Sequence, residues 1–248
     1  MTQYAKDDRA SRELVATACR VLAMKGLVDG ILGHVSLRVS ATELLVRCRG
    51  EEEMGLAHTQ VSDIWRVDLD GQAIDLPEGY KPPNELPIHT ELMRRDASVT
   101  SVVHAHPVSA LLVGLADISP RAIFGAYNIP AMKLAEREIP IYPRSVLIAR
   151  RELAEEMAVA MGESPVCLLR GHGITVSASS VEGATTTAID LDAILRVTVD
   201  LARIGAAPDP LPDADLAELP DLGRGFNERF VWQSLVADLA TLEAGRVL

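Results

Sequence analysis

Apolar side chains recur along the chain at two spacings, one typical of helices and one typical of strands. Helical spacing predicts helices over residues 8–25, 85–95, 108–116, 149–161, 180–204 and 227–244. Short apolar runs predict strands over residues 32–39, 43–47, 64–69, 99–103, 166–169 and 174–177. Ser179 and Glu182 offer a capping box for the start of the long helix. We therefore expect helices and strands to be mixed throughout the sequence.

Length and composition allow one large core. The chain has 248 residues, of which 48% are hydrophobic and 24% are charged, so a single domain over residues 1–248 is expected. Residues 120–145 are expected to form short irregular pieces. Residues 206–222 are rich in Pro, Asp and Ala and lack periodicity. The segment 206–248 is therefore expected to be a linker and a C-terminal helical arm, which in a monomer would fold back on the core.

Charge and cysteine content exclude several classes of protein. The formal net charge of −11 argues against nucleic acid and anionic membranes as partners, so local Arg, Lys or metal must hold any anionic substrate. No apolar stretch reaches the length of a membrane span, and the polar residues 1–12 predict no signal peptide. The 3 cysteines lack CxxC spacing, which suggests reduced thiols and a cytoplasmic protein. Cys167 lies in an apolar run and is expected in the core.

Two histidines, His104 and His106, follow the apolar run 99–103 and are the most informative pair in the chain. Side chains at positions i and i+2 of a strand point to the same face, so both imidazoles can reach one ion. Taken alone, such a pair is more often hydrogen-bonded in a core than bound to metal. His172 lies between two glycines, and Glu85 opens a predicted helix. Three imidazoles and a carboxylate are a donor set suited to a catalytic metal.

The order of these residues resembles the class II aldolase and adducin family, whose metal sites use a Glu, a helix, a His-x-His strand and a later glycine-flanked His. The resemblance covers roughly residues 8 to 205. It implies an α/β fold of the three-layer α+β kind, with a central, mainly antiparallel sheet flanked by helices. It also implies one divalent metal ion per subunit, with zinc expected and manganese or iron as alternatives. The ligands it implies are Glu85, His104, His106 and His172.

The same resemblance implies a homo-oligomer, in particular a tetramer, with active sites near subunit interfaces. The C-terminal segments of family members commonly lie at subunit contacts, so the arm 206–248 is expected at such a contact. A small anionic substrate is the expected partner of the site.

Three segments of this chain differ in sequence from the segments that bind the substrate's phosphate in the sugar-phosphate members of that family. Those members hold phosphate with small side chains at three places, where this chain has Gly33-His34-Val35-Ser36, Arg47-Cys48-Arg49-Gly50 and Pro83-Asn84. Arg binds a planar carboxylate in a bidentate fork, which favours a carboxylate substrate. The expected catalytic residues are Glu85 and His34. The expected substrate contacts are Arg49, Ser36, Asn84 and Tyr127.

Each of these assignments has a structural alternative. Arg49 could form a surface ion pair with residues 51–53, a run of three Glu. His34 could be a strand-end histidine bonded to backbone. His89, on the apolar stripe of the helix over 85–95, is expected to be a core histidine, with the substrate pocket as the alternative.

Three functions follow from this set of residues. The favoured one is a metal-dependent, non-oxidative decarboxylase of a hydroxylated aromatic or ring-cleavage dicarboxylate, such as a 3,4-dihydroxyphthalate or a hydroxypyridine dicarboxylate, in aromatic catabolism. Loss of carbon dioxide would leave a metal-stabilised enolate or phenolate that Glu85 or His34 protonates. The second is a sugar-phosphate aldolase, epimerase or dehydratase of the same family. The third is a non-catalytic, adducin-like assembly module, although a scaffold has no need of four metal-binding side chains.

Overall fold

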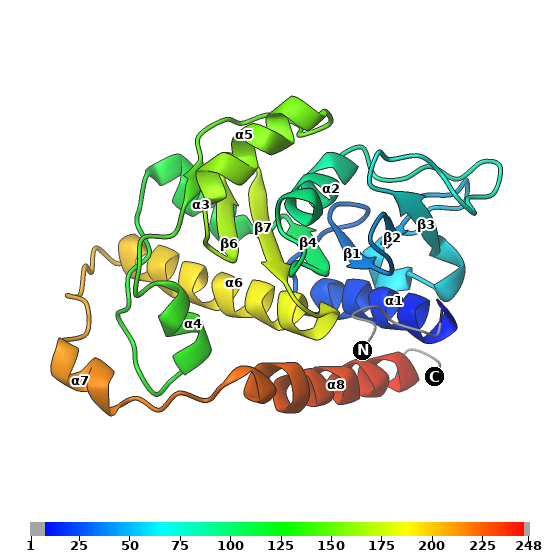
Figure 1. Ribbon diagram of the computed structural model, residues 1–248. Helices are drawn as coiled ribbons and strands as arrows, with labels where there is room; N and C mark the ends of the chain where they lie inside the picture. Colours follow the sequence, from blue (N-terminus) through cyan, green and yellow to red (C-terminus); the bar gives the residue numbers. More distant parts are fainter. Residues whose placement is uncertain (1–7, 246–248) are drawn as a thin grey trace.

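The computed structural model describes residues 8–245, which form a seven-stranded sheet between two helical layers (Figure 1). The strand order is β3-β2-β1-β4-β7-β6-β5, and all neighbours are antiparallel except β5 and β6. This arrangement confirms the predicted fold class. The strands are β1 His34–Arg38, β2 Glu43–Arg47, β3 Ile64–Asp68, β4 Ser101–Ala105, β5 Ile141–Tyr142, β6 Val166–Leu169 and β7 Gly173–Ala178.

Helices cover both faces of the sheet. In Figure 1, α2 and α5 lie above it, whereas α1 and α6 lie below it. The helices are α1 Asp8–Met24, α2 Leu86–Arg95, α3 Val108–Ala116, α4 Ile129–Leu134, α5 Arg151–Met161, α6 Val181–Arg203, α7 Asp213–Glu218 and α8 Trp232–Gly245. Three short turns are η1 Leu56–His58, η2 Val61–Asp63 and the π-helical η3 Phe226–Val231. No helix in the described part of the chain combines the length and apolar character needed to cross a membrane.

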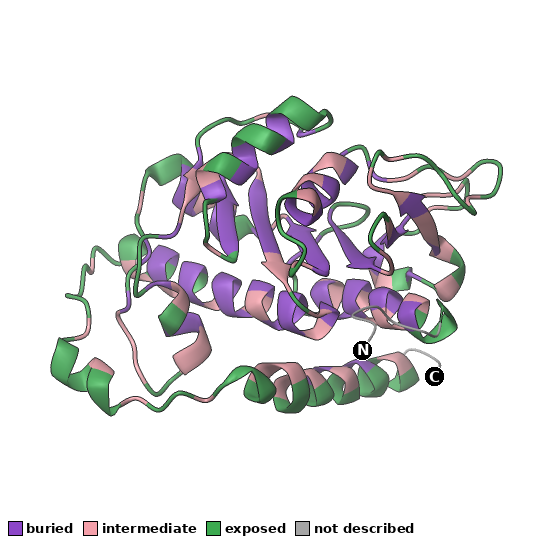
Figure 2. Cartoon of the chain, in the orientation of Figure 1, coloured by how far each residue is buried: buried purple, intermediate pink, exposed green. Residues whose placement is uncertain are grey.

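The two faces of the sheet belong to two different cores, because alternate residues of a strand point to opposite sides. Val103 and Ala105 contact the core that contains α1 and α6, whereas Val102 belongs to the core under α2 and α5. Figure 2 shows the central strands buried between these layers. The alternation directs His104 of β4 toward the side of α2. His34 of β1 is its direct partner in the strand register.

Most predicted elements have close counterparts. The strands over 43–47 and 166–169 and the helix over 108–116 have the predicted bounds. The segment 120–145, predicted to be irregular, contains α4 and β5.

The predicted capping box at the start of α6 is wrong. Ser180 is the N-cap residue, and its Oγ accepts a hydrogen bond from the backbone nitrogen of Gly183 at 3.0 Å. The serine one position later therefore caps the helix, and the predicted pair of Ser179 and Glu182 does not.

The C-terminal segment returns to the body of the molecule (Figure 1). Residues 206–222, predicted as a linker, contain the six-residue helix α7. Helix α8 then lies along α1, where Leu235 and Leu239 contact Val21 in a small core of their own. Burial of these apolar side chains supplies the attraction between the two helices. Within one chain the last helix therefore lies against α1, and the expected position of the arm at a subunit contact stays a prediction.

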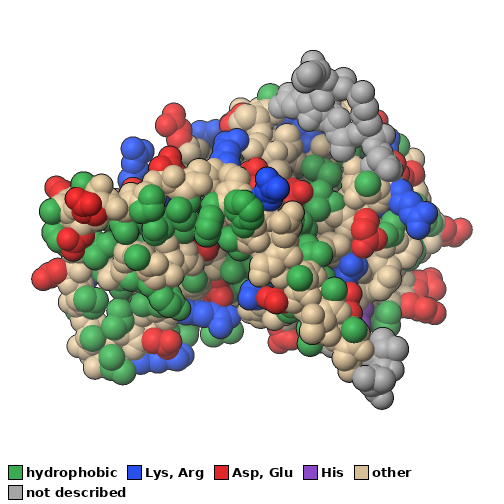
Figure 3. Space-filling model, turned by 90° about the horizontal axis from the view of Figure 1, so that it is seen from below, with side chains coloured by type: hydrophobic (Ala, Val, Ile, Leu, Met, Phe, Trp, Pro, Cys, Tyr) green, Lys and Arg blue, Asp and Glu red, His purple; other side chains and the backbone are tan. Residues whose placement is uncertain are grey.

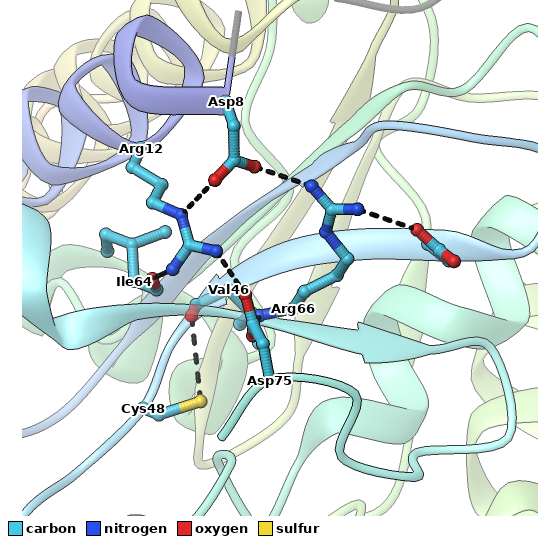
Figure 4. Close-up of polar contacts among 8 residues, drawn as sticks. Asp8, Arg12, Val46, Cys48, Ile64, Arg66 and Asp75 are labelled. Carbon is cyan, nitrogen blue, oxygen red and sulfur yellow. Dashed lines mark hydrogen bonds and ion pairs between the residues drawn. The ribbon is translucent and has the colours of Figure 1, made fainter. Parts of the chain in front are cut away.

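A network of charged residues joins the start of α1 to the β2–β3 hairpin (Figure 4). Arg12 binds both Asp8, at 2.7 Å, and Asp75. Arg66 binds the other carboxylate oxygen of Asp8 at 2.7 Å and reaches Glu43 at 3.3 Å. Because each arginine bridges two carboxylates, the network fixes the first turn of α1 against the sheet edge.

The cysteines are buried and unpaired. Cys19, Cys48 and Cys167 are free thiols in the interior, so the prediction of a core position for Cys167 is confirmed. Burial raises the pKa of the Cys48 thiol and that of the Cys167 thiol to about 12. In Figure 4 the Cys48 thiol points to the Val46 carbonyl. These thiols are therefore core side chains, and the cytoplasmic location stays a prediction.

Candidate metal centre

Four side chains converge at the C-terminal end of β4, a central strand of the sheet, where it pairs with the start of β7. The ligand atoms of Glu85, His104, His106 and His172 all lie within 4.8 Å of one another. The Nε2 atoms of His104 and His106 are 2.7 Å apart, and Glu85 Oε2 lies 3.3 Å from His104 Nε2. Glu85 Oε2 also lies 3.4 Å from His172 Nε2. The four predicted ligands are thus brought together around a common point.

These four side chains come from three places in the fold. His104 is on β4, and His106 follows that strand with its backbone nitrogen bonded to the Leu27 carbonyl at 3.0 Å. Glu85 is the N-cap residue of α2. His172 sits in the turn between β6 and β7. The sheet register and one helix start therefore define the centre together.

Hydrogen bonds from surrounding groups orient two of the four side chains. His104 Nδ1 donates to the Ile174 carbonyl at 2.9 Å, which leaves the Nε2 lone pair directed at the other ligands. Glu85 Oε1 accepts a hydrogen bond from the Ile148 backbone nitrogen at 2.8 Å, so Oε2 faces the imidazoles. The buried Nδ1 of His172 has no hydrogen-bond partner among residues 8–245. Packing and the turn backbone hold the His172 ring instead.

The turn that carries His172 requires glycine before it. Gly171 has φ of +62°, and a Cβ there would lie 2.6 Å from Ser145 Oγ. A side chain would be strained by both the dihedral angle and the contact. The sharp turn expected from the sequence is therefore present, and it places His172 opposite His106, with ring centroids 4.7 Å apart.

Electrostatics make this set suitable for a cation. Burial lowers the pKa of His104, and burial together with the neighbouring His104 lowers the pKa of His106 to about 3. Burial raises the pKa of Glu85, but hydrogen bonds with His104 and His172 outweigh it and bring the pKa below its usual value. Neutral imidazoles and an ionised carboxylate are donors that divalent metal ions accept. The four residues can hold one divalent cation.

A cavity of about 210 Å³ opens beside the centre. Its lining combines basic and polar side chains with exposed apolar ones. The lining residues are Ile31, Leu32, Gly33, His34, Arg47, Arg49, Pro83, Asn84, Glu85, His106 and Leu147. The cavity therefore adjoins two of the four clustered residues and carries two guanidinium groups.

The arginines of this cavity differ in their partners. Arg47 binds Glu53, and its Nε donates to Thr59 Oγ1 at 2.9 Å. Arg49 has no ion pair within the described residues, and its backbone forms a two-way bridge with Lys81. The alternative of a surface ion pair between Arg49 and the glutamates at 51–53 is therefore not observed. A guanidinium without a carboxylate partner is available for an anionic ligand.

The other predicted substrate contacts are divided between this cavity and other places. Asn84 and His34 line the cavity. Ser36 is fully buried, and its hydroxyl bonds His89 rather than facing the cavity. Tyr127 is 80% exposed and lines a different hollow beside α8, so its side chain lies away from the cavity beside the metal centre. The predicted direct contact from Ser36 needs this correction, because its side chain points under α2.

Two residues of the site were not assigned from the sequence. Arg47 shares its face with Arg49 two positions later, and that spacing is the signal that identifies it. His89 is fully buried, as the core interpretation predicts, but its Nε2 lies 2.6 Å from Nδ1 of His34. Burial lowers the pKa of His89 to about 3, and burial also lowers that of His34. Both imidazoles are therefore neutral.

The chain belongs to the class II aldolase and adducin family. Residues 13–199 match the family described as the Class II Aldolase and Adducin N-terminal domain. Among solved structures, L-fuculose 1-phosphate aldolase from Glaciozyma antarctica superposes with a TM-score of 0.79 at 17% identity. That similarity covers 96% of this chain and 91% of the aldolase, and it supports the fold.

Two decarboxylases give a more specific similarity. The chain is 50% identical over 233 residues to the 3,4-dihydroxyphthalate decarboxylase of Arthrobacter keyseri, which covers 93% of this chain and 94% of that enzyme. It is also 50% identical over 231 residues to the enzyme of the same name from a Terrabacter species, covering 92% of this chain and 96% of the relative.

Proposed function

We propose that this protein is a metal-dependent decarboxylase of a hydroxylated aromatic dicarboxylate of the 3,4-dihydroxyphthalate class. The observation that carries the proposal is one cavity in which an unpaired Arg49 lies beside the Glu85–histidine cluster. The near full-length similarity to 3,4-dihydroxyphthalate decarboxylases supports the choice of substrate. Small hydroxyl side chains suited to a phosphate are absent from the cavity lining among the described residues.

Glu85, His104, His106 and His172 would hold one divalent ion, with zinc expected and manganese or iron as alternatives. A bound divalent ion supplies a Lewis acid that withdraws electron density from substrate oxygens next to the departing carboxylate. The three imidazoles add no charge of their own, so the cation retains its strength as an acid.

The side chains of the cavity would orient the substrate and move one proton. Arg49 binds the carboxylate that is retained, in the bidentate geometry of a guanidinium. His34 donates a hydrogen bond to another substrate oxygen, and Asn84 offers its amide at the cavity edge. When the bond to the other carboxyl carbon breaks, carbon dioxide leaves and the electron pair stays with the ring. Glu85 takes the proton of the neighbouring hydroxyl group and delivers it to that ring carbon.

Product analysis tests this function. Metal-loaded protein given 3,4-dihydroxyphthalate should release one carbon dioxide per substrate and leave a dihydroxybenzoate, measured by gas analysis and chromatography. Glu85→Gln should abolish turnover. Cleavage of a sugar phosphate by the wild-type protein, with no release of carbon dioxide from the aromatic acid, would overturn the proposal in favour of an aldolase.

A metal assay tests the donor set. Purified protein should contain about one divalent ion per subunit by elemental analysis, because the four residues form a single cluster. His106→Ala should lose it, whereas His58→Ala, which changes an exposed histidine of η1, should retain it. Wild-type protein that binds no ion and has the same stability in chelator would instead favour a non-catalytic assembly module.

We also propose that the protein is a homotetramer with active sites near its subunit contacts, and that the arm 206–248 lies at such a contact. The exposed aromatic side chains of Tyr127, Phe226 and Phe230 support this, because large exposed apolar groups mark association surfaces. Figure 3, which views the molecule from below, shows hydrophobic side chains gathered on that face. Contact with a neighbouring subunit would be the route by which Tyr127 reaches a substrate. Light scattering that reports a monomer would overturn this assembly.

A further inference from the structure

A buried chain of three polar side chains leads from the cavity into the α2 layer. His34 Nδ1 lies 2.6 Å from His89 Nε2, and His89 Nδ1 lies 2.6 Å from Ser36 Oγ. His34 and Ser36 are two positions apart on β1 and therefore point to the same face. His89 is on α2, which covers that face. His89 and Ser36 have no solvent exposure, and His34 is 7% exposed.

The Ser36 hydroxyl, at the inner end of this chain, determines which atoms donate and which accept in the two hydrogen bonds. Within residues 8–245, His89 Nδ1 is the only hydrogen-bond partner of the Ser36 hydroxyl. If the hydroxyl only accepted, its own hydrogen would be buried without an acceptor, which is unfavourable. Ser36 therefore donates to His89 Nδ1. Because a neutral imidazole carries one hydrogen, His89 must carry it on Nε2 and donate it to His34 Nδ1.

The same reasoning determines the tautomer of His34, the ring at the end of the chain that faces the cavity. His34 accepts at Nδ1, so its hydrogen is on Nε2, the nitrogen that has no partner in the described chain. His34 lines the cavity, next to Asn84 and Arg49. An N–H group attracts the oxygens of a carboxylate or phenolate, whereas a nitrogen lone pair repels them.

We propose that Ser36 and His89 are positioning residues that hold His34 in the tautomer with hydrogen on Nε2, so that the cavity presents an N–H donor to an anionic substrate oxygen. The part of this inference that concerns substrate rests on the function proposed above. The tautomer itself does not depend on that function. Ser36, expected from the sequence to contact substrate directly, would instead act through two rings.

Nitrogen NMR of histidine-labelled, zinc-loaded protein tests the tautomer directly. His34 is expected to show a protonated Nε2 and an unprotonated Nδ1, and His89 the same pattern. In Ser36→Ala the two rings are expected to populate both tautomers, because the donor that sets their direction is gone. Ser36→Thr keeps a hydroxyl and should restore the wild-type pattern. A wild-type His34 with its hydrogen on Nδ1 would overturn the proposal, whatever the enzyme's substrate.

Kinetics with 3,4-dihydroxyphthalate test the consequence for the substrate. Ser36→Ala should raise KM about twofold, because a His34 ring that populates both tautomers equally presents the N–H donor to the substrate only half of the time, with kcat changed less. Thr198→Ala is the control, because it removes a buried hydroxyl of α6 that bonds the Ile194 backbone carbonyl and does not touch the three residues. Equal kinetics for the two variants would overturn the positioning role. Wild-type protein without activity would refute the proposed function alone, and the NMR result would still decide the tautomer.

Discussion

A Cβ atom added to Gly173 would lie 2.2 Å from the carbonyl oxygen of Ala105. Gly173 begins β7, and Ala105 ends β4 between His104 and His106, so the two backbones touch beside the turn that bears His172. The ring of His106 is also near, with Cδ2 3.1 Å from that Cβ position. Absence of a side chain at residue 173 is therefore a condition for bringing His172 to the other ligands.

Gly173→Ala should damage both stability and the metal centre. The added methyl group would force the two strands apart, at a cost of about 1–3 kcal/mol in the free energy of unfolding. The content of divalent metal should fall in parallel, as measured by elemental analysis beside denaturant unfolding. Gly225→Ala is the control, since nothing lies within 4 Å of its Cβ position. A Gly173→Ala protein with full metal content and wild-type stability would contradict this account.

Arg49→Ala should weaken substrate binding more than it slows the chemical step. Loss of a bidentate contact to a carboxylate should raise KM roughly 10- to 100-fold. Arg49→Lys should recover only part of the loss, because an ammonium group cannot form the planar fork. Steady-state kinetics on a dicarboxylate measure the effect, and Arg137→Ala, at an exposed position, serves as the control. If Arg49→Ala and Arg137→Ala had the same KM, Arg49 would have no part in binding.

His89 should make the fold sensitive to acid. Burial lowers its pKa from 6.5 to about 3, so between those values the unfolded chain binds a proton that the folded chain does not. Stability therefore rises with pH in this window, and about 2 kcal/mol should be lost at this residue between pH 7 and pH 5. Urea unfolding at both pH values measures it.

The matched variants isolate the contribution of His89. His89→Gln should remove this part of the pH dependence, whereas His58→Gln, at an exposed position, should leave it. Metal release affects all three proteins alike and cancels in the comparison. An unchanged pH dependence in His89→Gln would show that His89 titrates normally.

Asp8→Asn should lower the melting temperature only above acidic pH. Burial raises the pKa of Asp8, but hydrogen bonds from Arg12 and Arg66 outweigh it and bring the pKa below 3.8. The stabilisation is therefore present above about pH 4 and disappears as pH falls through the lowered pKa. Because Asp8 is half exposed, the loss at pH 7 should be only about 1–2 °C. Asp209→Asn, at an exposed residue, should cause no loss, and a deficit that persists at pH 2 would contradict the charge network.

Elements with a clear hydrophobic pattern could be predicted from the sequence. The run 166–169 corresponds to β6, because a strand buried on both faces is apolar along its length, and the apolar centre of residues 43–47 identifies β2 between Glu43 and Arg47. The missed elements α4, α7 and β5 are at most six residues long. Such short pieces have little intrinsic stability, and contacts from distant residues maintain them. No local pattern reports those contacts.

The same division applies to the site. Glu85, His104, His106 and His172 could be identified because their residue types, order and glycine neighbours limit the chemistry. The connection from Ser36 through His89 to His34 could not, because it depends on how α2 lies over β1. Strand alternation puts His34 and Ser36 on one face of β1, but only the orientation of α2 about its own axis brings His89 between them. Nor does any local pattern report that Tyr127 lies away from the cavity.

The order in which the ligands occur along the chain has a consequence for biosynthesis. When a nascent polypeptide has emerged from the ribosome as far as the end of β4, it already contains Glu85, His104 and His106. His172 becomes available only after β6 has been synthesised. The backbone of β7 must then join β4 before Ile174 can orient the His104 ring. Tight capture of the ion is therefore a late event of maturation, after translation has passed residue 178.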